Sequence, residues 1–170
     1  MKRYLVLILL TIFLSSCGTF NLDYFVMPDD AEFLTIIQEL NTPEKICNYM
    51  EDNFTFTFHE FYTPDPYTFW KLKEGDCNDF STFAVFVANY HEYETYQIYI
   101  YFQTGNEFHA IAVYKEYGKY TYSSNKSYYP IYTNSFKKCV FHYFLYSDRK
   151  LKSYKVYDYE NNLIEMGDFI

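Results

Sequence analysis

The sequence predicts an α+β domain in which helices precede a run of antiparallel strands. Three segments with apolar residues at helical spacing occupy the first half of the chain. Alternating segments rich in Tyr, Phe and Val fill most of the second half. A parallel sheet would instead need helices and strands to alternate along the chain. The 170 residues suit one domain with a sizeable core, and no internal repeat divides them.

The helical segments carry start signals as well as apolar stripes. Helices are expected from Asp30 to Leu40, from Thr42 to Asn53 and from Cys77 to His91. Asp30 and Thr42 are N-cap residues, and proline follows Thr42 at the first helical position, where a missing N–H costs nothing. The third helix has the cleanest apolar stripe, and Cys77 lies at its N-terminus.

The strand-like segments lie mainly after the third helix. Strands are expected at residues 96–102, 107–116, 119–124, 137–146 and 153–159, followed by a polar tail. The segment between the second and third helices begins with alternation that breaks at Pro64 and Pro66. It is therefore predicted to be a short extended stretch and a loop leading to Cys77.

The N-terminus has the features of a lipoprotein signal peptide. Lys2 and Arg3 precede a short apolar run, and the sequence "LSSC" ending at Cys17 resembles the bacterial lipobox. This resemblance implies a signal peptide over residues 1–16, a lipid on Cys17, a linker over residues 17–30 and a globular domain over residues 31–170. We therefore expect an exported protein anchored by lipid to the cell membrane or the outer membrane. A simple signal peptide with an incidental cysteine is the alternative.

Composition excludes some partners. Loss of Lys2 and Arg3 with the signal peptide leaves 12 basic against 22 acidic residues, and no basic cluster is present, so nucleic-acid binding is not expected. Aromatic residues make up 24% of the chain, which suits strands and an AT-rich genome but also a stacking surface for glycans or peptides.

The remaining cysteines are odd in number. Cys47, Cys77 and Cys139 leave at least one free thiol, and a Cys47–Cys139 bridge is an alternative to two buried thiols. No CxxC motif or Cys/His ligand spacing occurs, so the sequence predicts neither a metal site nor a cofactor.

Cys77 is the candidate nucleophile. A helix N-terminus lowers the pKa of a thiol, but a nucleophilic cysteine also needs a base. His91 lies fourteen residues along the same helix, about 21 Å away, and is too distant. His59 and His142 are not excluded by distance, but neither has an evident polar partner.

His109 is the best candidate for the base because a hairpin supplies it with a partner. A three-residue loop, with Gly118 at its left-handed position, pairs Lys115 with Lys119 and puts His109 opposite Asn125. A two-residue turn would need positive φ at Tyr117 and would put His109 opposite Lys126.

The motifs "GDCNDFSTF" and "FHAIAVYKEYGKYTYSSN" resemble the transglutaminase-like superfamily over roughly residues 42–130. The resemblance implies a papain-like fold, in which a helix bearing the cysteine packs on an antiparallel sheet bearing the histidine. It implies Cys77 as nucleophile, His109 as general base and acid, and Asn125 in the place of the usual aspartate. An amide can fix an imidazole tautomer but supplies no charge. Ser123 and Ser124 are less favoured, since a shift of one residue turns a side chain to the other face.

Two neighbours of the motif are expected to be structural. Asp79 would cap or charge the first turn of the helix, and Trp70 would pack in the core or over the rim of the site. The function implied by the resemblance is cysteine-dependent acyl transfer or hydrolysis at amide bonds of a peptide or protein. The alternatives are an inactive module that binds a peptide, glycan or envelope protein, and a purely structural envelope lipoprotein.

Overall fold

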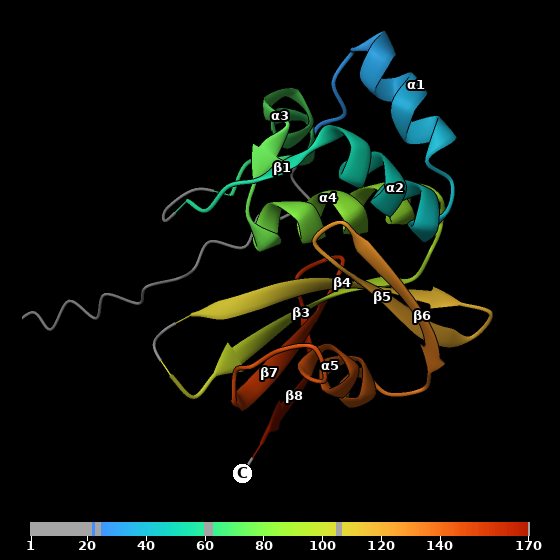
Figure 1. Ribbon diagram of the computed structural model, residues 1–170. Coiled ribbons are helices and arrows are strands. Elements are labelled where there is room, and N and C mark those ends of the chain that lie inside the picture. The colour runs from blue at the N-terminus through green and yellow to red at the C-terminus, as the bar shows by residue number, and fades with distance from the viewer. Residues whose placement is uncertain (1–21, 23–24, 60–62, 105–106, 170) are drawn as a thin grey trace, which may run out of the picture.

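The computed structural model describes residue 22 and residues 25–59, 63–104 and 107–169. The predicted signal peptide and Cys17 lie outside the described residues. The described chain is an α+β domain of three layers, with four helices on one face of an antiparallel sheet and a fifth helix on the other face (Figure 1). In the described part of the chain, no helix has both the length and the hydropathy needed to cross a membrane.

The helices are α1 (Ala31–Glu39), α2 (Pro43–Asn53), α3 (Pro66–Leu72), α4 (Cys77–Tyr90) and α5 (Phe136–Phe144). The main sheet contains β3 (Thr95–Phe102), β4 (Phe108–Glu116), β5 (Lys119–Ser124), β6 (Ser127–Thr133), β7 (Leu151–Asp158) and β8 (Leu163–Asp168). Its strand order is β6-β5-β4-β3-β7-β8, and every neighbouring pair is antiparallel. Two short strands, β1 (Thr55–Phe56) and β2 (Glu74–Gly75), pair in parallel just before α4.

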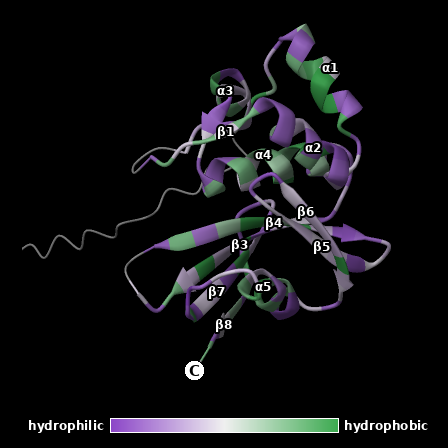
Figure 2. Ribbon diagram, in the orientation of Figure 1, coloured by the Kyte–Doolittle hydropathy of each residue, from purple (hydrophilic) through white to green (hydrophobic). Residues whose placement is uncertain are grey.

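The sheet separates two apolar clusters. Residues of α1 to α4 pack against Ala112 and Tyr114 on one face of β4. Ile111 and Val113, on the other face of the same strand, pack with Cys139 and Val140 of α5. The apolar colouring along α4, β3 and β4 in Figure 2 follows this arrangement. The core therefore fixes α4 on one face of the sheet and α5 on the other.

The predicted starts of the first two helices are confirmed. The Asp30 side chain accepts hydrogen bonds from the backbone N–H groups of Glu32 and Phe33, and Thr42 caps α2 ahead of Pro43. Each cap satisfies N–H groups that have no partner inside the helix. The third predicted helix is also present, and it begins at Cys77.

The strand predicted at residues 137–146 is wrong, because this segment forms α5. Phe136, Cys139 and Val140 are its buried residues, and their spacing is helical. Aromatic residues on either side gave the segment a β-like composition. Burial of one helical stripe under the sheet outweighs that preference.

Three further elements were not predicted. Residues 66–72 form α3, in which Asp65 is the N-cap and Pro66 the first helical residue. Residues 127–133 form β6 at one edge of the sheet, and residues in the predicted polar tail form β8 at the other edge. Pro130 is compatible with β6 because an edge strand has one side free of ladder hydrogen bonds.

The predicted linker over residues 17–30 is in part packed against the domain. Leu22 is buried, and the ring of Phe25 meets that of Phe86 with centroids 5.0 Å apart. Packing against α4 therefore begins before the predicted boundary at residue 31.

Candidate active site

The start of α4 holds Cys77 in a defined place. Asp76 is the N-cap, and its side chain accepts a hydrogen bond of 2.9 Å from the N–H of Asn78. In return, Asp79 Oδ2 accepts one of 2.7 Å from the N–H of Asp76. This reciprocal capping box lies around Cys77, whose thiol is partly exposed. The thiol is therefore at the positive end of a helix dipole, where a thiolate is stabilised.

Gly75 allows the chain to enter α4 along this path. A Cβ atom at residue 75 would lie 2.4 Å from Asp79 Oδ2 and 2.8 Å from Phe69 Cε2. Any larger residue would push the chain away from the side chain that caps it. The glycine of the "GDC" motif thus has a packing reason that is independent of catalysis.

A buried hydrogen-bond network fixes α4 to the sheet. The Tyr99 hydroxyl donates to Asn78 Oδ1 at 2.8 Å, and Gln97 Nε2 donates to the hydroxyls of Ser81 and Thr82, each at 3.0 Å. Trp70 lies farther away in the α1–α4 core, where its Nε1–H donates to the Tyr49 hydroxyl at 2.8 Å. Trp70 therefore has a core position, and the network next to Cys77 comes from β3.

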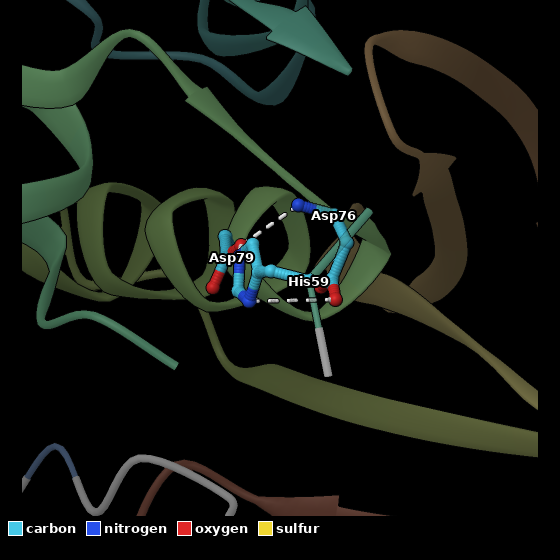
Figure 3. A group of neighbouring side chains, drawn as sticks. All are labelled: His59, Asp76 and Asp79. Carbon is cyan, nitrogen blue, oxygen red and sulfur yellow. Dashed lines mark hydrogen bonds and ion pairs between the residues drawn. The ribbon is translucent and has the colours of Figure 1, made fainter. Parts of the chain in front are cut away.

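His59 lies across the first turn of α4, between Asp76 and Asp79 (Figure 3). Its Nε2 is 2.5 Å from Asp79 Oδ2, and its Nδ1 is 4.0 Å from Asp76 Oδ2. Burial raises the pKa of Asp79 to about 6, although hydrogen bonds from Asp76 and His59 act in the opposite direction. Asp79 thus has a structural role in this turn.

The same three side chains could hold a metal ion. One ligand atom from each of His59, Asp76 and Asp79 lies within 4.8 Å of the others. Carboxylate oxygens suit a hard divalent cation, and an imidazole nitrogen is a common metal ligand. No ligand spacing along the chain predicts this group, because His59 reaches α4 only through the tertiary fold. The pairing of His59 with Asp79 also supplies the polar partner that was not evident from sequence.

His109, the predicted base, is the second residue of β4 and faces α5. It shares this face with Ile111 and Val113, which belong to the α5-side core. Its Nε2 lies 2.8 Å from Ser124 Oγ, and its ring stacks on Tyr143 of α5. Burial, with the charge of Arg149 as a smaller cause, lowers the pKa of His109 to about 4. The imidazole is therefore neutral near pH 7.

The predicted register of the β4–β5 hairpin is wrong by one residue. Glu116 pairs with Lys119, so the turn contains only Tyr117 and Gly118, both with positive φ. The backbone of Tyr117 has a φ of 53°, and its side chain projects into solvent. The two-residue turn that was judged unfavourable for an aromatic residue is therefore the one the chain adopts.

The shift in register changes the partner of His109. Ser124 pairs with Ile111 and so shares the face on which His109 lies. The orienting contact expected from Asn125 is made by Ser124. Asn125 lies in the β5–β6 turn with a φ of 48°, and its Oδ1 is buried with no hydrogen-bond partner among the described residues. Its membership of a catalytic set stays a prediction.

Tyr143 of α5 lies against His109. Its ring centroid is 4.7 Å from that of His109, with an angle of 10° between the planes. Its pKa is raised chiefly by burial, and the Cys77 thiol adds to this effect through space. Cys77 is on α4, whereas the side chain of His109 is on the face of the sheet that α5 covers.

The other cysteines and histidines are in structural positions. Cys47 and Cys139 are free buried thiols, so the alternative of a bridge between them is excluded. Burial raises the pKa of each of these thiols to about 12. His142 Nδ1 is 2.8 Å from the Tyr122 hydroxyl, and His91 Nε2 is 2.7 Å from the carbonyl oxygen of Ile37. Of the three thiols in the described part of the chain, Cys77 is the one that is partly exposed and at a helix N-terminus.

Comparison with known proteins identifies the fold. No protein-family model matches the chain, and no curated protein matches its sequence. Among solved structures, the chain is similar to Legionella pneumophila LapG (EGTA-treated), with a TM-score of 0.51 and 15% identity over 79% of this chain and 77% of that chain. It is also similar to LapG in two further structures, one of them calcium-bound, each with a TM-score of 0.48 and 14% identity over 71% of this chain and 70% of that chain.

The likeness to the EGTA-treated structure, with its TM-score of 0.51, supports the class of fold. LapG is a transglutaminase-like cysteine protease with a papain-like fold, and this chain has the same α+β architecture. At 15% identity, the likeness shows the fold alone.

Proposed function

We propose that this protein is an exported, lipid-anchored enzyme that transfers or hydrolyses acyl groups at amide bonds of a peptide or protein. The observation that carries the proposal is the position of a partly exposed Cys77 at the N-terminus of α4. A neutral His109, whose ring is held by Ser124 and Tyr143, supports it. The transglutaminase-like fold is consistent with this use of the two residues.

The proposed reaction follows from the chemistry of the pair. His109 takes the thiol proton of Cys77, and the sulfur attacks the carbonyl carbon of the amide. The N-terminal end of α4 stabilises the negative charge that develops on the carbonyl oxygen. The amine leaves with the proton from His109, and a thioester remains on Cys77. Water as acceptor then gives hydrolysis, whereas an amine gives cross-linking.

The orienting residue is the least usual part of the proposed site. Ser124 fixes one ring nitrogen of His109, but a hydroxyl supplies no charge to stabilise an imidazolium ion. This observation favours the second candidate function, a catalytically inactive module that retains the fold and binds a peptide, glycan or envelope protein. The two candidates differ in whether Cys77 forms a thioester.

Acylation by p-nitrophenyl acetate tests the proposal without knowledge of the substrate. Attack by the Cys77 thiolate breaks the ester bond, releases p-nitrophenolate and leaves an acetyl thioester that peptide mass spectrometry can locate. We expect acetylation of Cys77 in the full chain and a loss of at least about tenfold in its rate in His109→Ala. His91→Ala is the matched control and should react like the wild type. Equal rates in the wild type and in His109→Ala would favour the binding module.

A further inference from the structure

The Tyr143 ring stacks on His109, and no sequence motif indicated this residue. It lies near the C-terminal end of α5, on the opposite side of the sheet from the helix that bears Cys77. Its ring is nearly parallel to the imidazole, at a centroid distance of 4.7 Å. This geometry is that of a close aromatic stack, which restricts rotation of both rings.

From this stacking geometry, and from the Ser124 contact at Nε2, we infer that Tyr143 is a positioning residue for His109 in the proposed reaction. The inference rests on the proposed function. Ser124 Oγ holds one ring nitrogen of the imidazole at 2.8 Å, and Tyr143 covers one ring face. Together these contacts fix the ring plane, so that the second nitrogen keeps a constant direction.

The position of the tyrosine is itself fixed. Tyr143 packs against the α5-side core. A ring held in this way can cover one face of the imidazole without moving away from it. This cover agrees with the lowered pKa of the half-buried His109, to which burial contributes most.

The charged and titratable groups that act on the pair include Arg149, Cys77 and Tyr129 of β6, and Tyr129 raises the pKa of Tyr143. Arg149, in the loop before β7, lowers the pKa of both His109 and Tyr143, whereas the Cys77 thiol raises that of Tyr143. Arg149 is half exposed and forms an ion pair of 2.7 Å with Glu107. The stacked tyrosine covers one face of the half-buried His109 ring.

Two measurements on the full chain test the inference. The first is the rate of alkylation of Cys77 by iodoacetamide at pH 7, followed by peptide mass spectrometry, and the second is the NMR titration of the His109 imidazole. In Tyr143→Leu we expect the alkylation rate to fall about tenfold, because a misplaced base loses reactivity steeply. We also expect the pKa of His109 to rise towards its usual value of about 6.5, because water reaches the ring.

The control variants separate positioning from folding. Tyr143→Phe keeps the stacked ring. Its alkylation rate should stay within about twofold of the wild-type rate, and the pKa of His109 should stay close to the wild-type value. Tyr146→Leu changes an exposed tyrosine close by and should leave both values unchanged. In the wild type, the His109 ring protons should show the upfield shift of a nucleus above an aromatic face. This last measurement requires no variant to fold.

The outcomes are distinguishable. A normal shift for the His109 ring protons, or a Tyr143→Leu variant that alkylates and titrates like the wild type, would overturn the positioning role. If His109→Ala reduces the rate while Tyr143→Leu does not, the proposed function survives and this inference alone is lost. If His109→Ala also has no effect, the proposed function is lost and the inference is lost with it.

Discussion

His109 is held by neighbours that differ from those expected from sequence. Ser124 bonds its Nε2, and Tyr143 covers its ring, whereas Asn125 lies one position too far along, in a turn. A shift of one residue in an antiparallel pair exchanges the face on which a side chain lies. The partner of His109 is therefore decided by the length of the hairpin turn.

Substitution of the two candidate orienting residues distinguishes them. Ser124→Ala removes the partner of Nε2 and should reduce the alkylation rate of Cys77 at pH 7 about tenfold. Asn125→Ala should leave the alkylation rate unchanged but lower the free energy of unfolding by about 1 kcal/mol, because alanine resists positive φ. Reaction with iodoacetamide and urea unfolding measure the two effects. Slower alkylation of Cys77 in Asn125→Ala, with a normal alkylation rate in Ser124→Ala, would restore Asn125 to the orienting role.

The lowered pKa of His109 predicts a pH dependence of stability. Between about pH 6.5, where the unfolded histidine titrates, and about pH 4, where the folded one does, the unfolded chain binds more protons. Stability contributed by His109 is thus present above pH 6.5 and is lost as the pH falls to 4. Relative to His109→Asn, which has no such titration, the free energy of unfolding of the wild type should fall by about 3 kcal/mol over this range. Urea unfolding of both chains at pH 7 and pH 4 measures the difference, and a constant difference would contradict the assignment.

At the scale of elements, α4 was predictable because its signals are local. Its apolar stripe, its N-cap and the position of Cys77 all lie within a single stretch of sequence. The segment that forms α5 was not predicted as a helix because its aromatic residues also suit a strand. This segment forms a helix because its apolar residues pack on one face of the sheet. The group of His59 with Asp76 and Asp79 was likewise not predictable, since a loop and a helix meet there only in the folded chain.

The β4–β5 turn offers a prediction at this scale. Tyr117 is at the first of the two turn positions with a φ of 53°, and its side chain is 92% exposed, so little packing is lost on substitution. Tyr117→Asn should raise the free energy of unfolding by about 1 kcal/mol, because asparagine tolerates the left-handed region far better. Lys119→Asn is the control in the adjacent strand and should give no gain. Thermal unfolding measures both, and a less stable Tyr117→Asn would argue against this register.

At the scale of the whole molecule, the sheet brings the ends of distant segments together. Residues 77, 109, 124 and 143 come from α4, β4, β5 and α5, of which the sequence predicts only the first three. The order of helix, strand and strand predicted the architecture and the candidate nucleophile and base. The wall of the site formed by α5 could not be predicted, because it comes from a segment whose secondary structure was assigned wrongly.

The lipid anchor on Cys17 is a prediction for the whole chain in its membrane. Cys17→Ser removes the thiol that the lipobox-like motif offers for acylation, and the variant should lose its lipid. In a detergent phase separation of cells that export the protein, the wild type should enter the detergent phase and Cys17→Ser the aqueous phase, since acyl chains hold a protein on a membrane. Cys47→Ser changes a buried thiol and is the control. Identical partition of Cys17→Ser and wild type would exclude this anchor.

The most direct test of the Cys77–His109 pair is the pH dependence of iodoacetamide labelling between pH 5 and pH 9. Cys47 and Cys139 serve as internal controls, because both are buried and burial raises the pKa of each thiol to about 12. At pH 6 to 7, we expect labelling of Cys77 to be about tenfold faster in the wild type than in His109→Ala, which should react mainly above about pH 8, like an unperturbed thiol. Superimposable profiles for the two chains, both with labelling confined above about pH 8, would contradict the account.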